Sequence, residues 1–331
     1  MSLAEKKKSV YLFGAGATHA ELMNLDPDLI VEERGLRIGD VSSRVIEKAR
    51  RNKKYLKDVE IVSGTGGSLN IELLISLIEN SKINNWAYKT SYLKKLVEKD
   101  IKAILTTHQI KQFYLHDALF ELHEHERTMA NEEVIGLISL NYDNVLDRAY
   151  KAVLRKQPNY CLSLEKNAPS IKNIPLLKLH GSFSWKSQKI RGKQRKIEII
   201  PLGASKSYLH APYSFIWNRA LEILIESDML RVIGCSLNPN DTHLIDLLFK
   251  AHLERPKAFD IEIIDFEDTG NEIRNNYGFF PQIKTWKELE GSSIPEPVPV
   301  NPFKTWLKYK SIAMLGEENI NGTQHLKKVV T

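Results

Sequence analysis

The chain has 331 residues, of which 42% are hydrophobic and 27% charged, and its formal net charge is +6. This composition is typical of a folded globular protein and excludes an intrinsically disordered one. The length suits one large α/β domain with a smaller module, or two domains. No apolar run is long enough to cross a bilayer, and the N-terminus lacks the apolar segment of a signal peptide, so we expect a cytoplasmic protein. The two cysteines, Cys161 and Cys235, are too few for a four-cysteine zinc site, and we expect no bound metal.

The first predicted element is a short buried strand over residues 9–13, which runs into a turn that contains Gly14 and Gly16. We expect a helix to begin at or just after Thr18. Glycines let the backbone approach a ligand, and the N–H groups of a helix start favour an anion such as phosphate. A dehydrogenase fingerprint requires a third glycine at position 19, where this chain has His19. A strand-to-helix turn without a ligand is the alternative interpretation.

Residues 30–132 are expected to form a helical insertion. Apolar residues at helical spacing predict helices that begin near Leu69 and cover residues 92–105 and 109–128. Three histidines of this region suggest a metal site, but His123 and His125 point to different helix faces, so we interpret them and His116 as surface residues. The glycine-rich stretch 63–68 has neither a lysine nor a preceding strand, which argues against a phosphate-binding loop.

Four further strands are predicted, each with polar or small residues directly after it. The strands cover residues 134–140, 174–179, 229–233 and 260–266. The residues at their ends are Asn141-Tyr142-Asp143, His180-Gly181, Gly234-Cys235-Ser236 and Asp265. Strands that alternate with helical segments predict an α/β fold with a doubly wound, mostly parallel, Rossmann-like sheet. Ligands of such folds bind beyond the carboxyl ends of the strands.

The remaining segments predict less about function. The basic stretch 186–196 is expected to be a solvated loop or hairpin that leads into a strand over 197–200, and a helix over 214–225 places Trp217 in the core. Four prolines in 292–302 predict an extended linker. The amphipathic piece 303–312 docks either on the body of the protein or on another subunit. We therefore expect a catalytic domain over residues 1–290 and a linker with a C-terminal tail over 291–331.

Taken in order, the strand ends Gly14-Ala15-Gly16-Ala17-Thr18, Asn141-Tyr142-Asp143, His180-Gly181 and Gly234-Cys235-Ser236 resemble those of the sirtuin superfamily. The resemblance is stronger to its bacterial sirtuin-like branch, whose members are NAD-degrading effectors of antiphage defence. It implies that Asn141 grips the nicotinamide-side ribose and a water, that Asp143 binds the nicotinamide amide, and that His180 is a general base. It also implies binding roles for two groups of residues. The pyrophosphate is held by Gly14, Ala15, Gly16 and Thr18, and the adenosine by Gly234, Ser236 and Asp265.

Two departures from the family pattern bear on the activity. Protein deacylases of this superfamily carry a four-cysteine zinc ribbon after the His-Gly motif, where this chain has the basic stretch 186–196. They also continue the opening motif with Gly-Ile-Pro-Asp-Phe-Arg, where this chain has His19-Ala20-Glu21-Leu22. Both departures favour simple hydrolysis of NAD. The resemblance thus implies an NAD glycohydrolase that is restrained by homo-oligomerisation or by a nucleic-acid-translocating ATPase partner.

Other function classes remain open at the level of sequence. A non-catalytic module that binds NAD or ADP-ribose and serves assembly or nucleic-acid contact is supported by the basic segments 48–57 and 186–196. A protein deacylase is disfavoured by the missing zinc cysteines, and a dehydrogenase by the missing third glycine.

Overall fold

The computed structural model describes residues 6–26, 28, 31–52, 70–82, 85–107, 113–129, 132–162, 173–185, 188–190, 193–195, 199–200, 207–237, 241–255, 257, 260–266, 272–286 and 301–330. The predicted turn at 63–68 lies outside these residues. So do residues 292–300 of the predicted linker and residues 197–198 of the strand expected before Ile200.

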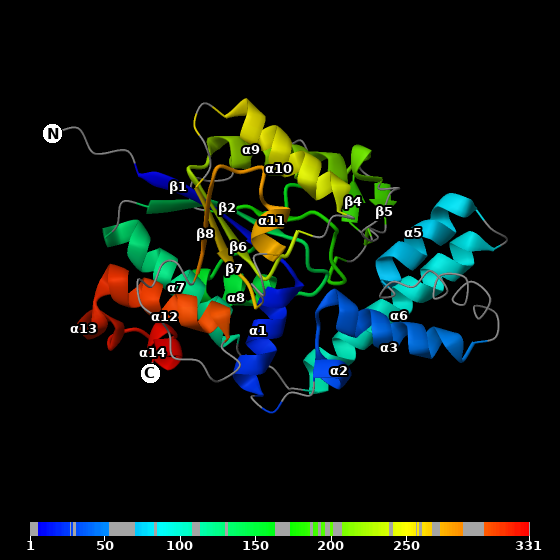
Figure 1. The fold of residues 1–331 in the computed structure, drawn as a ribbon, viewed down its shortest axis with the longest axis horizontal. Helices are drawn as coiled ribbons and strands as arrows, with labels where there is room; N and C mark the ends of the chain where they lie inside the picture. The colour runs from blue at the N-terminus through cyan, green and yellow to red at the C-terminus, as the bar shows by residue number, and fades with distance from the viewer. Residues whose placement is uncertain are drawn as a thin grey trace.

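A six-stranded sheet forms the centre of the molecule (Figure 1). Its strands are β1 (Lys7–Phe13), β2 (Glu132–Ser139), β3 (Leu176–Lys178), β6 (Met229–Ile233), β7 (Asp260–Ile264) and β8 (Gln282–Thr285). They are all parallel and lie in the order β3-β2-β1-β6-β7-β8. This is the strand order of a Rossmann sheet, which confirms the predicted doubly wound fold. The chain winds outward from β1 to β3 and then crosses back to β6, so the winding direction changes between β1 and β6.

Helices cover both faces of the sheet, because successive side chains of each buried strand point to opposite faces. Val10 and Leu12 of β1 pack in the core formed with α9 (Tyr213–Glu226) and α10 (Thr242–Glu254). Tyr11 and Phe13 face a second core on the opposite side. That core includes α1 (Ala15–Leu25), α7 (Tyr114–Met129), α8 (Val145–Leu154) and α12 (Pro302–Leu315). None of the helices that the structure describes has the length and apolar character of a membrane span.

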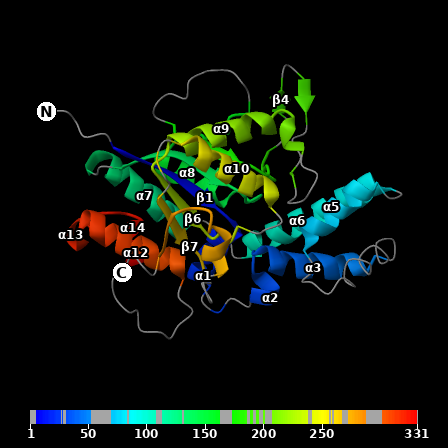
Figure 2. The same cartoon turned by 45° about the horizontal axis from the view of Figure 1, so that its top comes forward.

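Most described residues between α1 and α7 are helical, and we call this segment the insertion. Its helices are α2 (Val31–Arg34), α3 (Ile38–Arg50), α5 (Ile71–Ser81) and α6 (Trp86–Thr107). Two views show that α3, α5 and α6 pack together and extend from the sheet on the side opposite to α12 (Figures 1 and 2). Arg44 and Lys48 of α3 both form ion pairs with the buried Asp100 of α6, at 2.8 and 2.5 Å. The insertion therefore has its own polar and apolar contacts.

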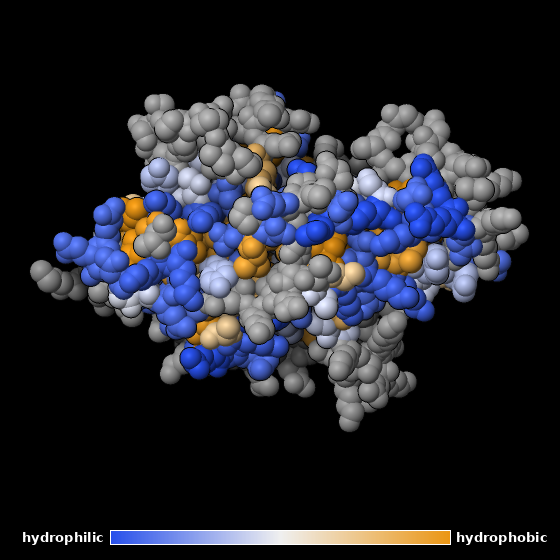
Figure 3. Space-filling model, turned by 90° about the horizontal axis from the view of Figure 1, so that it is seen from below, coloured by the Kyte–Doolittle hydropathy of each residue, from blue (hydrophilic) through white to orange (hydrophobic). Residues whose placement is uncertain are grey.

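Several shorter elements complete the chain. Two antiparallel strands, β4 (Gln188–Ile190) and β5 (Lys193–Arg195), pair within the basic stretch, where a loop or hairpin was expected. The sequence analysis did not predict β8, α10, the 3-10 turn η1 (Ser207–Leu209) or α11 (Glu272–Asn276). A space-filling view from below shows hydrophobic patches set among predominantly hydrophilic residues (Figure 3).

The C-terminal helices α12, α13 (Glu317–Ile320) and α14 (Leu326–Val330) dock on the body of the protein, which decides between the two placements expected for the tail. Glu121 of α7 accepts hydrogen bonds from the backbone N–H groups of Gln324, His325 and Leu326, at 2.6–2.8 Å. Trp306 of α12 donates its indole N–H to Glu262 of β7 at 2.6 Å.

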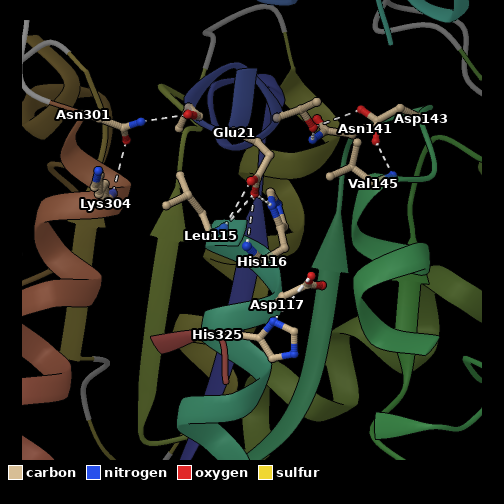
Figure 4. A network of polar contacts seen from close by, with 12 residues as sticks. Glu21, Leu115, His116, Asp117, Asn141, Asp143, Val145, Asn301, Lys304 and His325 are labelled. Carbon is tan, nitrogen blue, oxygen red and sulfur yellow. Dashed lines mark hydrogen bonds and ion pairs between the residues drawn. The ribbon is translucent and has the colours of Figure 1, made fainter. Parts of the chain in front are cut away.

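The prediction that His116 and His123 are surface residues is wrong. Only 1% of His116 and 6% of His123 is exposed, because α7 lies between the sheet and the C-terminal helices. The imidazole Nδ1 of His116 lies 2.8 Å from the carboxylate of Glu21, which also accepts the backbone N–H groups of Leu115 and His116 (Figure 4). These contacts join α1 to the first turn of α7. The third histidine, His125, is half-buried.

A buried charge network spans the sheet face under α12. The guanidinium of Arg231 in β6 is fully buried and contacts Glu262 at 2.7 Å and Glu132 at 3.0 Å, and it donates to the hydroxyl of Tyr11 at 3.0 Å. Burial alone would raise the pKa of Glu132, but hydrogen bonding to Arg231 and its charge lower that pKa to about 2. Four of the six strands and α12 are thus joined by one set of polar contacts.

Candidate functional site

A cavity of about 470 Å³ lies beyond the carboxyl ends of β1, β2, β6 and β7, where the winding direction of the sheet changes. Ligands of open α/β sheets bind at such switch points, and this volume falls within the range of small-molecule sites. Every residue predicted for the site from the sequence lines this one cavity. They are Gly14, Ala15, Gly16, Thr18, Asn141, Asp143, His180, Gly234, Ser236 and Asp265. Their individual roles stay predictions.

The glycine turn after β1 packs directly on the loop after β6. Gly16 donates its N–H to the carbonyl of Gly234 at 2.9 Å, and a Cβ atom on Gly14 would lie 2.2 Å from the same oxygen. Gly234 has φ +63°, and its Cβ would lie 2.1 Å from the backbone nitrogen of Ala17. These glycines are therefore required for the close approach of two protein backbones, a reason that the sequence analysis did not foresee.

The helix after this turn begins earlier than predicted. α1 starts at Ala15, with Gly14 as its N-cap, and not at Thr18. The reason is the backbone contact with the β6 loop, which holds the chain in helical geometry from Ala15 onward without a side-chain cap. Thr18 consequently lies in the first turn of α1, and its side chain faces the end of β2. The N–H groups of Gly16 and Ala17 are already bonded to protein carbonyls, so a ligand anion at this helix start depends on the helix dipole and on the Ala15 amide.

A chain of hydrogen bonds joins α1 to the residues after β2 (Figure 4). The side-chain amide of Asn141 donates to the carbonyl of Gly14 at 2.8 Å and to the hydroxyl of Thr18 at 3.1 Å. The Thr18 hydroxyl donates in turn to Asp143 at 3.0 Å, and the other carboxylate oxygen of Asp143 accepts the N–H of Val145 at the start of α8. Because a carbonyl only accepts hydrogen bonds, this network fixes the orientation of the Asn141 amide. Its oxygen is the atom that can accept a hydrogen bond from a ligand.

His180 follows β3 and is almost fully buried in the cavity wall, with 1% exposure. Its Nε2 lies 3.7 Å from a carboxylate oxygen of Asp241, which is 2% exposed. Asp241 also caps α10, because its other oxygen accepts the N–H of Leu244 at 3.3 Å. The sequence analysis did not select Asp241, although an aspartate that precedes an apolar helical run is a typical N-cap signal. His180 and Asp241 therefore form a buried pair on the cavity wall.

The residues around Asn141 and His180 are held by further buried contacts. Lys178 of β3 is 1% exposed; its ammonium group donates to the backbone carbonyl of Asp143 and lies 2.9 Å from the carboxylate of Asp147. The backbone N–H of Phe183 donates to the carbonyl of Tyr142 at 2.9 Å. The ends of β2 and β3 are therefore linked to each other and to α8.

Tyr142 and Glu72 form a second polar contact that the sequence analysis missed. The Tyr142 hydroxyl donates to the carboxylate of Glu72 at 2.8 Å and also lies 3.1 Å from the carbonyl of Ile200. Burial, and then the charge of Glu72, raise the pKa of Tyr142 well above its ordinary value, so the phenol keeps its proton. The sequence analysis did not select Glu72, which lies in the first turn of α5.

The β6 and β7 ends form the other side of the cavity. Ser236 is exposed, and its carbonyl accepts the side-chain amide of Asn276 at 2.8 Å. Asp265 accepts the N–H of Phe266 at 2.7 Å. Cys235 is buried, as expected for a small apolar residue, and burial raises the pKa of its thiol to about 12, which makes it a poor nucleophile. Within the part of the chain that the structure describes, no group of three or more His, Cys, Asp or Glu side chains has the arrangement of a metal site.

Comparisons with known proteins add similarities of overall structure only. No protein-family model and no curated protein matches the chain. A structure of Sir2Tm bound to a propionylated peptide is similar over 93% of both chains, with 12% identity and a TM-score of 0.42. A Sir2 homolog–NAD complex covers 99% of this chain and 92% of its own, with 13% identity and a TM-score of 0.40. A Sir2–p53 peptide–NAD+ complex covers 87% and 95%, with 13% identity and a TM-score of 0.37. The strand order and the position of the cavity, independently of these similarities, define an α/β protein of the Rossmann type.

Proposed function

We propose that the protein is an NAD glycohydrolase, with NAD as its substrate and nicotinamide and ADP-ribose as its products. One observation carries the proposal: Asn141, Asp143 and His180 line the same cavity as the glycine turn after β1. This is the set of residues to which the resemblance to sirtuin-like NAD hydrolases assigns the chemistry. The catalytic unit would comprise residues 1–290, including the helical insertion, and residues 291–331 would form the linker and tail.

The reaction requires the glycosidic bond between the nicotinamide nitrogen and the ribose anomeric carbon to break. The electron pair of that bond leaves with nicotinamide, and an oxocarbenium-like sugar remains, to which a water molecule adds. The Asn141 oxygen, held by the contacts of its amide group to Gly14 and Thr18, would accept a hydrogen bond from a ribose hydroxyl or from that water. Asp143 would hold the nicotinamide amide.

His180 would take the proton that the attacking water loses. The carboxylate of Asp241, 3.7 Å from Nε2, would stabilise the imidazolium that results. Because both side chains are almost fully buried, dissolved salt screens their electrostatic interaction less than it screens the interaction of an ion pair on the surface. The two residues thus suit a base that must gain and then release a proton.

The start of α1, next to Asn141, and the ends of β6 and β7 suit the rest of the dinucleotide. Gly14, Ala15, Gly16 and Thr18 lie at the start of α1, where the helix dipole favours the pyrophosphate. Arg37 of the insertion contributes a positive charge to the cavity lining, although its guanidinium also pairs with Asp40 at 3.2 Å. Gly234, Ser236 and Asp265 would line the adenosine.

The test is nicotinamide release from NAD by the purified protein and by Asn141→Ala and His180→Ala. Asn319→Ala and His325→Ala are matched controls, because they make the same changes in the C-terminal region, away from the cavity. We expect release by the wild type and both controls, and a loss of at least about a hundredfold in the two site variants. Circular dichroism shows whether the folding is retained. The absence of release by the wild type, both alone and with candidate partner proteins, while ADP-ribose still binds, would instead favour the non-catalytic binding module.

The wider role that we propose also follows from the resemblance: NAD depletion in infected bacterial cells, in the cytoplasm. An unrestrained NAD hydrolase would harm its host, so homo-oligomerisation or a nucleic-acid-translocating ATPase partner would control it. Expression in bacteria with and without a candidate partner, followed by measurement of cellular NAD, tests this role. NAD that stays constant under all conditions, although the purified protein is active, would contradict it.

A further inference from the structure

The cavity wall contains a carboxylate that comes from the helical insertion. Glu72 lies in the first turn of α5, is 5% exposed and lines the cavity. Its backbone N–H is capped by the side chain of Asn70 at 2.8 Å. An ionised carboxylate is costly to bury unless its surroundings stabilise it. Two features do so here: the positive end of the α5 dipole and the hydrogen bond from the Tyr142 hydroxyl.

The position of this charge within the site follows from its partner. Tyr142 stands between Asn141 and Asp143, the two residues proposed to hold the nicotinamide end of the substrate. The ring of Tyr142 also lies 6.2 Å from the ring of His180, measured between centroids. Glu72 is therefore near the place where nicotinamide and its ribose would lie, and not near the adenosine end at β7.

A negative charge at that position has a defined chemical use. The nicotinamide ring of NAD carries a positive charge, and as the glycosidic bond breaks this charge moves to the anomeric carbon of the ribose. A fixed carboxylate beside both positions attracts the bound substrate and stabilises the oxocarbenium-like sugar. The only Lys or Arg side chain among the described residues of the cavity lining is Arg37, which pairs with Asp40.

We infer that Glu72 is a further catalytic residue, which recognises the cationic pyridinium end of the dinucleotide and stabilises the positively charged sugar. This inference rests on the proposed function. It assigns a chemical purpose to the insertion, which would supply the charge that makes the site selective for oxidised, positively charged NAD+.

The test compares the binding of NAD+ with that of ADP-ribose, which lacks the nicotinamide. Titrations use the full-length chain with His180→Ala, so that turnover does not interfere, with and without Glu72→Gln. Glutamine keeps an oxygen that can accept the Tyr142 hydrogen bond, so the fold is retained while the charge is removed. The matched control is Glu79→Gln in the same helix, where Glu79 pairs with Lys94 at 2.8 Å away from the cavity.

We expect Glu72→Gln to weaken NAD+ binding by about tenfold, the order that a partly desolvated pair of unit charges supports, and to change ADP-ribose binding by less than about twofold. Glu79→Gln should change neither. Unchanged NAD+ binding, or an equal loss for NAD+ and ADP-ribose, would overturn the role of Glu72. These titrations do not depend on turnover. A wild-type protein that binds NAD+ with this charge dependence but releases no nicotinamide would overturn the proposed hydrolase and the stabilisation of the sugar by Glu72, and would leave its recognition of the cationic nicotinamide end supported. A protein that does not bind NAD+ would sink both.

Discussion

Arg231 lies at the centre of the buried charge network beneath α12, and its replacement by methionine tests how much this network contributes to the free energy of unfolding. The substitution keeps an unbranched side chain in the core but leaves Glu132 and Glu262 buried without the guanidinium. Lys310 remains 3.9 Å from Glu132 and neutralises it only in part. Removing one partner of a buried ion pair typically costs about 3–5 kcal/mol of unfolding free energy.

The lowered pKa of Glu132 gives a second measure of how much its contacts with Arg231 and Lys310 stabilise the folded state. A fall from 4.5 to about 2 corresponds to about 3 kcal/mol of stability at neutral pH. Because this pKa is lowered in the folded state, the stabilisation is present above pH 4.5 and is lost as the pH falls toward 2. The wild type loses the stabilisation from the ionised Glu132 in acid, whereas Arg231→Met lacks this stabilisation at every pH. The difference in stability between them should therefore narrow by about 2 kcal/mol near pH 3.

The measurement is the denaturant midpoint and slope of both proteins at neutral pH and near pH 3. Arg219→Met is the control, since Arg219 pairs with Glu222 at 2.8 Å on the surface, and it should cost less than about 1 kcal/mol. A loss of less than about 1 kcal/mol in Arg231→Met, or a loss that does not change with pH, would refute the reasoning.

Three further substitutions test the site. Gly234→Ala should lower the free energy of unfolding by about 2–4 kcal/mol, because the alanine has a positive φ and its Cβ clashes with α1. The control is Gly316→Ala, where φ is +73° and the space is open, so only the backbone strain should lower its stability. Equal melting temperatures for the two variants would contradict this reasoning. Thr18→Val keeps the side-chain volume but removes the hydroxyl that links Asn141 to Asp143. Nicotinamide release should slow about tenfold, and the free energy of unfolding should fall by about 1 kcal/mol. Unchanged release would count against a role of this network in the reaction. Asp241→Asn can still cap α10 but loses the negative charge beside His180. Nicotinamide release should therefore slow at least about tenfold, while the melting temperature is retained. Release at the wild-type rate would exclude Asp241 from the mechanism.

The local signals in the sequence were strong wherever a whole segment is buried. β6 begins and ends at the predicted residues, 229 and 233, because four of its five residues are apolar and Gly234 follows directly, which favours a short buried strand. β8 was missed for the opposite reason: three of its four residues are exposed or half-buried, and its sequence Gln-Ile-Lys-Thr has no apolar run. α1 was placed three residues late, because its start depends on the β6 loop, more than 200 residues away.

Buried polar residues show the same limit. His116 looks like a surface residue in the sequence, since its partner Glu21 is 95 residues away and the two meet only when α7 packs on α1. Asp241 has the local signature of a helix cap, and only the fold places its second oxygen beside His180. Glu72 reads as a favourable charge in the first turn of a helix, and only the packing of the insertion brings it to Tyr142.

The sequence alone determined the parallel α/β architecture and the residues at the strand ends. Both follow from local periodicity and from the rule that parallel strands place their carboxyl ends at one edge of a sheet. The tertiary structure decided which glycine faces which backbone, that the tail docks on the body, and that the insertion supplies Glu72 and Arg37 to the cavity. These features are contacts between segments far apart in the chain, and no local pattern of residues specifies which distant segment a side chain will meet.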